Sequence, residues 1–180
     1  MNQALIVIDV QEAFDDPRMG KRNNPGCEDN IRSLLKYWRE NNWPIVLVRH
    51  DSINPGSPLA PGNPGNALKP GIEGPHDLFI TKHTNSAFYG EPSLDAWLSK
   101  KGIKDVVICG ITTDHCCSTT ARMAENLGYD VTVVEDAMHT HDRTSPSGET
   151  IAADEVHRVN IASLSEEFAR VVRTKDLLHK

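Results

Sequence analysis

Short apolar segments recur along the chain and are separated by stretches with a helical pattern. Residues 4–10, 44–50, 78–82, 105–110 and 130–135 are apolar and rich in β-branched side chains. Runs of this length without regular polar alternation are typical of parallel strands buried on both faces of a sheet. Residues 168–172 form a shorter segment of the same kind, so we expect six strands.

Apolar residues recur at helical spacing between these strands. The alternation of strands and helices predicts a three-layer α/β/α sandwich with right-handed crossovers, Rossmann-like, built as one domain over residues 1–180. The expected helices are marked by Ile31, Leu34, Leu35 and Trp38; by Leu94, Trp97 and Leu98 between Pro92 and Gly102; by a start near Asp114; and by a stripe of Ala152, Val156, Val159 and Ala162 within residues 151–163.

Residues 51–75 interrupt this rhythm. The segment holds six of the 11 prolines and five of the 12 glycines and shows neither period. It leaves the carboxyl end of the second strand, where doubly wound sheets bind ligands. We expect a loop that forms part of a lid or a subunit contact, with a solvated surface loop as the alternative.

Composition excludes several classes of protein. The net charge of -6 argues against nucleic acid as the main partner, and no apolar run approaches the roughly 20 residues of a membrane span. The N-terminus lacks the features of a secretory signal, so we expect a cytoplasmic protein. The four cysteines include no CxxC spacing, which favours reduced thiols over a disulfide framework or a zinc site.

Common nucleotide-binding and hydrolase motifs are absent from the sequence. There is no GxGxxG after the first strand, no GxxxxGK[ST] loop and no GxSxG elbow. Candidate chemistry is instead found at the carboxyl ends of expected strands, where an open α/β sheet keeps its site.

Two charged residues end such strands. Asp9 follows Leu5-Ile6-Val7-Ile8, where burial can raise its pKa toward that of a working base, although an Asp that caps the next turn is the simpler interpretation. Lys82 closes Leu78-Phe79-Ile80-Thr81 and can supply a fixed positive charge, although for this lysine taken alone a solvated side chain is the favoured interpretation. The polar segment 83–88 that follows is typical of a pocket lining.

Cys116 is the candidate nucleophile. It lies in Gly110-Ile111-Thr112-Thr113-Asp114-His115-Cys116-Cys117, where the chain leaves a strand and enters a helix with Thr113 or Asp114 as N-cap. A first helical turn offers free N–H groups and a positive dipole end, so we expect a lowered thiol pKa and oxyanion donors together. The charge of Asp114 opposes this unless its carboxylate is turned away into a cap or an ion pair.

The other cysteines are expected to be structural. Cys117 shares a helical stripe with Ala121, Ala124 and Gly128, which predicts a core position, while Cys116 points about 100° away. Cys109 lies inside a strand and Cys27 in an early loop, so packing or surface roles explain both.

Histidines offer a rival site. His139 and His141 follow the fifth strand in an expected irregular loop, and with His50 and Asp51 they could bind a metal. Because the loop fixes no ligand spacing, a polar loop or a substrate contact is the favoured interpretation.

Taken together, these residues resemble the isochorismatase-like cysteine hydrolases, which include nicotinamidases and N-carbamoylsarcosine amidase. The resemblance rests on the D-x-Q at Asp9, on Lys82 followed by Asn85-Ser86-Ala87-Phe88, and on the segment 110–116 followed by Thr120-Ala121. It implies a six-stranded sheet in the order 3-2-1-4-5-6 and a triad of Asp9, Lys82 and Cys116. It also implies a cis Ile111–Thr112 peptide and an oxyanion hole made by the backbone N–H groups of Thr112 and Cys116.

The resemblance further implies a small-molecule amidase that acts through a thioester, without a cofactor, as a homo-oligomer (dimer or tetramer). Arg49-His50-Asp51-Ser52 lacks the D-x-H metal motif of nicotinamidases, and Cys116 argues against a vinyl-ether-cleaving isochorismatase. A metal-assisted hydrolase and a non-catalytic binding protein on the same fold are the alternatives. The expected substrate contacts are Gln11, Phe14, His50, Phe88 and His115, with residues 51–75 and 139–143 as outer contacts.

Overall fold

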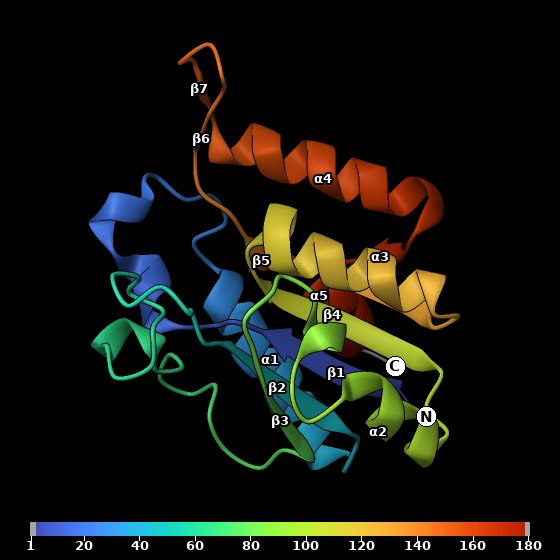
Figure 1. The fold of residues 1–180 in the computed structure, drawn as a ribbon. Coiled ribbons are helices and arrows are strands. Elements are labelled where there is room, and N and C mark those ends of the chain that lie inside the picture. The colour runs from blue at the N-terminus through green and yellow to red at the C-terminus, as the bar shows by residue number, and fades with distance from the viewer. Residues whose placement is uncertain (1–2, 179–180) are drawn as a thin grey trace.

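The computed structural model describes residues 3–178, and its centre is a parallel sheet of six strands (Figure 1). The strand order is β3-β2-β1-β4-β5-β8, which confirms the predicted order with β8 as the sixth strand. The strands are β1 Gln3–Ile8, β2 Ile45–His50, β3 Leu78–Lys82, β4 Asp105–Ile111, β5 Asp130–His139 and β8 Arg170–Val172.

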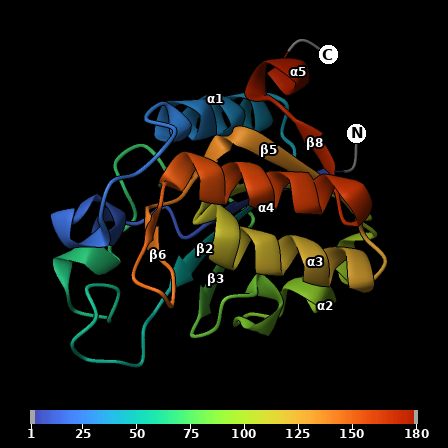
Figure 2. The same ribbon diagram turned by 90° about the horizontal axis from the view of Figure 1, so that it is seen from above.

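Helices cover both faces of the sheet, which confirms the three-layer sandwich. Figure 2 shows α1 and α5 on one side and α2, α3 and α4 on the other. None of the helices within residues 3–178 is long and apolar enough to cross a membrane. The helices are α1 Cys27–Glu40, α2 Leu94–Lys101, α3 Ser118–Asn126, α4 Ala153–Glu167 and α5 Thr174–Leu178.

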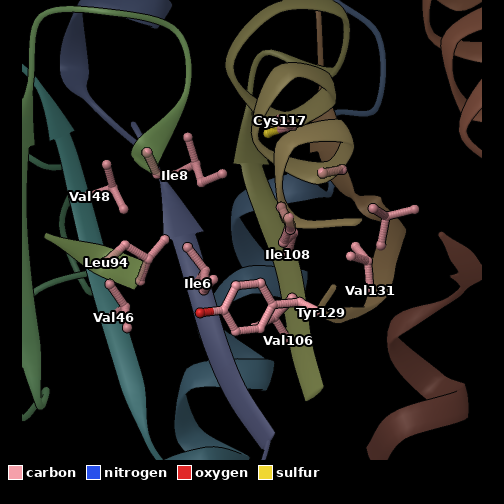
Figure 3. Packing of buried hydrophobic residues seen from close by; sticks show 14 of the residues in the cluster. Ile6, Ile8, Val46, Val48, Leu94, Val106, Ile108, Cys117, Tyr129 and Val131 are labelled. Atoms are coloured by element: carbon pink, nitrogen blue, oxygen red, sulfur yellow. The ribbon is translucent and has the colours of Figure 1, made fainter. Parts of the chain in front are cut away.

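Each strand supplies side chains to two apolar layers, because successive residues point to opposite faces. Ile6 and Ile8 of β1 pack in the layer beneath α2, α3 and α4, whereas Leu5 and Val7 pack beneath α1. Figure 3 shows the first layer, where Ile6 and Ile8 lie beside Ile108 of β4. Complete burial of such side chains stabilises the fold by about 1.5–3 kcal/mol each.

β5 is longer than its apolar run predicts. The run ends at residue 135, but the strand continues to His139 after a shift of register against β4 between Ile108 and Gly110. The half-buried Glu135 and Asp136 lie in the shifted part. His139 therefore ends a strand, and the expected irregular loop at this residue was wrong.

α4 buries a different face from the one predicted. Val159 is 52% exposed, while Ile161 and Leu164 are buried. The helix begins at Ala153, because the preceding residues form the strand β7 (Thr150–Ile151), which pairs with β6 (Arg143–Thr144). An error of one residue turns a helical face by about 100°, which accounts for the wrong stripe.

The loop 51–75 is fastened to the sheet and to α1. It contains the short 3-10 helix Pro64–Asn66, and the side-chain amide of Asn66 donates to the carbonyl oxygen of His50 at 3.1 Å. Arg39 of α1 donates to the carbonyl oxygen of Ile72 at 3.2 Å. The loop thus frames the end of β2, and its role as a lid or a subunit contact stays a prediction.

Candidate active site

Asp9, Lys82 and Cys116 meet at the carboxyl edge of the sheet. Lys82 Nζ lies 2.6 Å from Asp9 Oδ2 and 3.4 Å from Cys116 Sγ. The side chains of Asp9 and Lys82 are 0% exposed, and Cys116 is 7% exposed. Three residues that follow three separate strands therefore form one buried cluster, in which Cys116 is the most exposed member.

Lys82 reaches the cluster across the end of β2. It pairs in register with His50 on β2, and β2 separates β3 from β1. Its ammonium group also donates to the carbonyl oxygen of Thr84 at 3.0 Å and lies 3.3 Å from His50 Nδ1. The long side chain thus spans the distance that the strand order imposes.

Asp9 is placed by an unusual backbone. Its φ is +50°, a left-handed conformation that Asp tolerates better than most residues, and its N–H donates to Val48 at 2.9 Å. Gly110 of β4 has a φ of +130°, and a Cβ there would lie 2.1 Å from the carbonyl oxygen of Ile8. Only glycine allows β4 to approach β1 this closely beside Asp9.

One oxygen of the Asp9 carboxylate is available to a proton. Oδ2 binds Lys82, whereas Oδ1 is buried and has no hydrogen-bond partner among residues 3–178. Buried polar atoms are nearly always hydrogen-bonded, and the Cys116 thiol is a neighbouring side chain that interacts with this carboxylate.

Cys116 lies in a π-helical turn, Thr113–Cys117, that precedes α3. The prediction of an α-helical first turn capped by Thr113 or Asp114 was wrong, because the extended N-cap residue is Thr112. The wider turn begins at the Ile111–Thr112 peptide, which is cis as expected. Single π-turns are rare and often occur at functional sites.

Contacts on both sides fix the π-turn. Arg143 Nε donates to Asp114 Oδ2 at 2.7 Å, and the hydroxyl of Thr140 donates to Asp114 Oδ1 at 2.5 Å. The hydroxyl of Thr113 lies 2.8 Å from Nδ1 of His157 on α4. The Asp114 charge is therefore neutralised in an ion pair, the condition that a thiolate at Cys116 requires.

Burial sets the direction of the pKa shifts of Asp9 and Cys116, but not that of Lys82. It raises the pKa of Asp9, against the opposing charge of Lys82. It would lower the pKa of Lys82, but Asp9 and Cys116 outweigh it and raise that pKa. Burial and then the Asp9 charge raise the pKa of the Cys116 thiol. The predicted lowering of this pKa was wrong, since burial and a nearby carboxylate outweigh the helical turn.

Gln11 and His50 belong to the site in different ways. The side-chain amide of the buried Gln11 donates to the carbonyl oxygens of His50 at 3.0 Å and Asn66 at 2.9 Å. Its oxygen accepts a hydrogen bond from His50 N at 2.8 Å. Gln11 therefore clamps the protein's own backbone, and its expected contact with a substrate stays a prediction. The ring of His50 faces the ammonium of Lys82.

The expected aromatic wall of the pocket is only partly assembled. His115 is exposed beside Cys116, with Nε2 at 3.5 Å from Asp114 Oδ2. The ring of Phe14 is buried and stacks on His141 at 6.3 Å, and the ring of Phe88 packs on Tyr129 at 5.7 Å. Both Phe rings thus pack against side chains of the protein itself.

Asn85, which was named only as part of the segment after Lys82 and without a role, is a neighbour of the Cys116 sulfur. Its Oδ1 lies 3.9 Å from Cys116 Sγ, and its side chain is exposed. The polar segment after the third strand was the available signal, but it did not distinguish Asn85 from its neighbours.

The predicted set of metal ligands is not assembled. Asp51 is bound by Arg49 at 2.7 Å, and the rings of His139 and His141 pack edge to face at 5.2 Å. His50 faces Lys82 instead. These side chains have separate partners and do not converge on one point.

A different group of three donors lies close together within residues 3–178. Single ligand atoms of Asp9, His50 and Cys116 lie within 4.8 Å of one another. Lys82 Nζ lies 2.6, 3.3 and 3.4 Å from the nearest atoms of these residues. The ammonium therefore already holds the position that a metal cation would take.

Comparisons with known proteins agree with this architecture. The protein-family model described as isochorismatase domain matches residues 3–176 of this chain. The isochorismatase family protein YrdC of Bacillus subtilis (strain 168) is 40% identical over 179 residues, 98% of this chain and 95% of that protein. A crystal structure from Chromobacterium violaceum ATCC 12472, described as a hydrolase of the isochorismatase family, superposes with a TM-score of 0.93 at 41% identity, over 98% of this chain and 92% of that one.

A streptothricin hydrolase of Streptomyces noursei is 33% identical over 141 residues, which is 78% of this chain and 50% of that protein. The domain match spans nearly all of the residues that carry the sheet and the buried cluster. The chain therefore belongs to the isochorismatase family and is a hydrolase of that family.

Proposed function

We propose that this hydrolase cleaves an amide-type C–N bond of a small molecule through a thioester on Cys116. Asp9 acts as the base and Lys82 orients both partners. The observation that carries the proposal is the buried contact of Lys82 with Asp9 and Cys116, at 2.6 and 3.4 Å. The similarity to a streptothricin hydrolase supports a hydrolytic reaction.

Charge balance favours Asp9 as the base. With the thiol protonated, the cluster holds one carboxylate and one ammonium, and its net charge is zero. Transfer of the thiol proton to Asp9 Oδ1 moves the negative charge to Sγ and leaves the net charge unchanged. Because an uncompensated buried charge is costly, this internal transfer is the route to a thiolate that the site supports.

The reaction then proceeds by transfer of the acyl group to Sγ. Sγ forms a bond to the carbonyl carbon, and the carbonyl electron pair moves to oxygen, where the N–H groups of Thr112 and Cys116 donate to it. The oxyanion collapses, the C–N bond breaks, and the leaving nitrogen takes the proton from Asp9. Water then attacks the thioester, Asp9 removes its proton, and the thiol is restored as the acid leaves.

The test is hydrolysis of a panel of small amides, ureides and lactams, followed as release of amine. For a substrate found in this way, Cys116→Ala should abolish turnover, and Asp9→Asn should lower it by about 100- to 10,000-fold because the base is lost. Cys117→Ala is the matched control, since Cys117 is buried in the core. Intact-mass analysis of a quenched reaction should show the acyl adduct. Peptide mapping should locate it on the peptide that contains Cys116.

Full turnover in Cys116→Ala would exclude the thioester. Full turnover in Asp9→Asn would exclude the assigned base, even if the adduct forms.

A further inference from the structure

More hydrogen-bond acceptors surround the ammonium group of Lys82 than it has N–H groups to donate. A lysine ammonium carries three N–H donors. Four acceptors surround Lys82 Nζ: Asp9 Oδ2 at 2.6 Å, the carbonyl oxygen of Thr84 at 3.0 Å, His50 Nδ1 at 3.3 Å and Cys116 Sγ at 3.4 Å. At least two of these four acceptors must share one proton.

Two of the four contacts are settled by distance and charge. The short contact to the Asp9 carboxylate is charge-assisted, and the contact to Thr84 has ordinary hydrogen-bond length. The contacts to His50 Nδ1 at 3.3 Å and to Cys116 Sγ at 3.4 Å are both within hydrogen-bonding reach, since a hydrogen bond to the larger sulfur atom is ordinarily longer. The third N–H of Lys82 is therefore contested between His50 Nδ1 and Cys116 Sγ.

The surroundings of His50 determine its tautomer. An ammonium only donates, so Nδ1 of a neutral His50 must be the acceptor and its proton must lie on Nε2. The charges that act on the pKa of His50 are those of Lys82, Asp9, His83 and Asp51, and donor atoms of Asp9 and Cys116 lie within 4.8 Å of the ring nitrogen. Burial and the Lys82 charge keep the pKa of His50 below its ordinary value.

The position of His50 is fixed by its backbone. The side-chain amide of Gln11 accepts from His50 N at 2.8 Å and donates to His50 O at 3.0 Å. Gln11 therefore holds both the backbone N–H and the carbonyl oxygen of His50. The ring of His50 therefore contacts Lys82 in the protein itself, without a ligand to hold it in place.

We propose that His50 is a positioning residue that competes with Cys116 for the third N–H of Lys82. The proposal rests on the triad of the proposed function and adds a fourth member to it. In the resting site His50 takes part of this N–H, and the thiol stays protonated. Once the thiol proton has moved to Asp9, the thiolate is the stronger acceptor and the N–H turns to Sγ.

This role predicts a gain of reactivity that a structural role does not. Without an acceptor at residue 50, Lys82 directs its third N–H to Sγ and stabilises the thiolate. His50→Leu should therefore be alkylated faster at Cys116 than the wild type. A residue that merely supports the fold would give a slower or an unchanged reaction when replaced.

The experiment measures the rate of Cys116 alkylation by iodoacetamide from pH 5.5 to 9.5, with peptide mapping of the site. We expect His50→Leu to react about tenfold faster than the wild type at neutral pH, which corresponds to a thiol pKa lower by about one unit. His50→Asn should restore most of the wild-type profile, because its Oδ1 can replace Nδ1. His76→Asn is the matched control, since His76 is exposed and its Nδ1 contacts the carbonyl oxygen of Gly74 instead.

An equal or slower reaction in a folded His50→Leu variant would overturn the proposal. If that variant does not fold, the ¹⁵N shifts of the wild-type imidazole decide, with the resonance assigned through its loss in His50→Asn. Nδ1 should be unprotonated, and a protonated Nδ1 would contradict the competition. Amide turnover is not needed for either readout, so failure of the triad, seen as turnover by Cys116→Ala, is distinguishable from failure of this inference.

Discussion

At the scale of single residues, Gln11 joins two segments that frame the triad. Its amide binds the end of β2 through His50 and the loop 51–75 through Asn66. The residue is fully buried, and the Asn66 carbonyl oxygen and the His50 N–H lose their side-chain partner when the amide is removed. A buried group without its partner costs about 1–3 kcal/mol.

Gln11→Leu should accordingly lower the free energy of unfolding by about 2 kcal/mol, as measured by urea denaturation. Asn85→Ala is the control, because its exposed side chain should change stability by less than about 0.5 kcal/mol. A residue that only bound substrate would leave the stability unchanged. Unaltered denaturation of Gln11→Leu would therefore refute the clamp.

The three residues of the proposed triad could be predicted because each follows a buried strand, and parallel strands end at one edge. The directions of Gln11 and Phe88 could not, since both lie in turns where tertiary contacts decide. Gln11 finds backbone partners 39 and 55 residues away, and Phe88 finds Tyr129. Sequence pattern carries no information on such distant pairings.

At the scale of elements, the π-turn Thr113–Cys117 depends on its neighbours. Asp114 links it to Arg143 of β6 and to Thr140, and Thr113 links it to α4. Burial by itself would raise the pKa of Asp114, but its hydrogen bonds with Arg143 and Thr140 lower it to about 2. Because this pKa lies below that of an unfolded aspartate, the ionised carboxylate stabilises the folded state.

Asp114→Asn should therefore be less stable than the wild type at neutral pH. The contribution of Asp114 is present above pH 4 and is lost as the pH falls from about 4 through about 2. Unfolding free energies of both proteins should converge over that range. A difference that stays constant down to pH 2 would show that the charge of Asp114 plays no part.

Strand positions followed from the apolar runs, but two boundaries did not. The extension of β5 to His139 passes through Glu135 and Asp136, where Asp136 Oδ1 accepts hydrogen bonds from Thr174. A pattern of apolar residues ends at such positions although the backbone pairing continues. The face of α4 was misplaced because its start depends on the hairpin β6–β7, which no apolar run marks.

At the scale of the whole molecule, the fold encloses several histidines in neutral form. His50, His139, His141 and His157 all have a lowered pKa, chiefly because of burial. The pKa of His139 falls to about 3. Both nitrogens of His139 are buried without a hydrogen-bond partner among residues 3–178. The unfolded chain binds protons at these residues below about pH 6.5, whereas the folded chain binds them only at a lower pH.

This difference between the histidine pKa values of the folded and the unfolded chain predicts a loss of stability in acid. The loss should begin at a pH well above that at which carboxylates titrate. Since the folded pKa of His139 lies below the unfolded value, its contribution to stability is present above about pH 6.5 and is lost as the pH falls toward 3. Lowering the pH from 6.5 to 5 should cost about 2 kcal/mol through this residue alone. Urea unfolding at several pH values should show the loss in the wild type and a flatter profile in His139→Phe, which keeps the ring without titrating. His76→Asn, at an exposed histidine, should follow the wild-type profile, and equal slopes in all three proteins would mean that His139 is not the residue responsible.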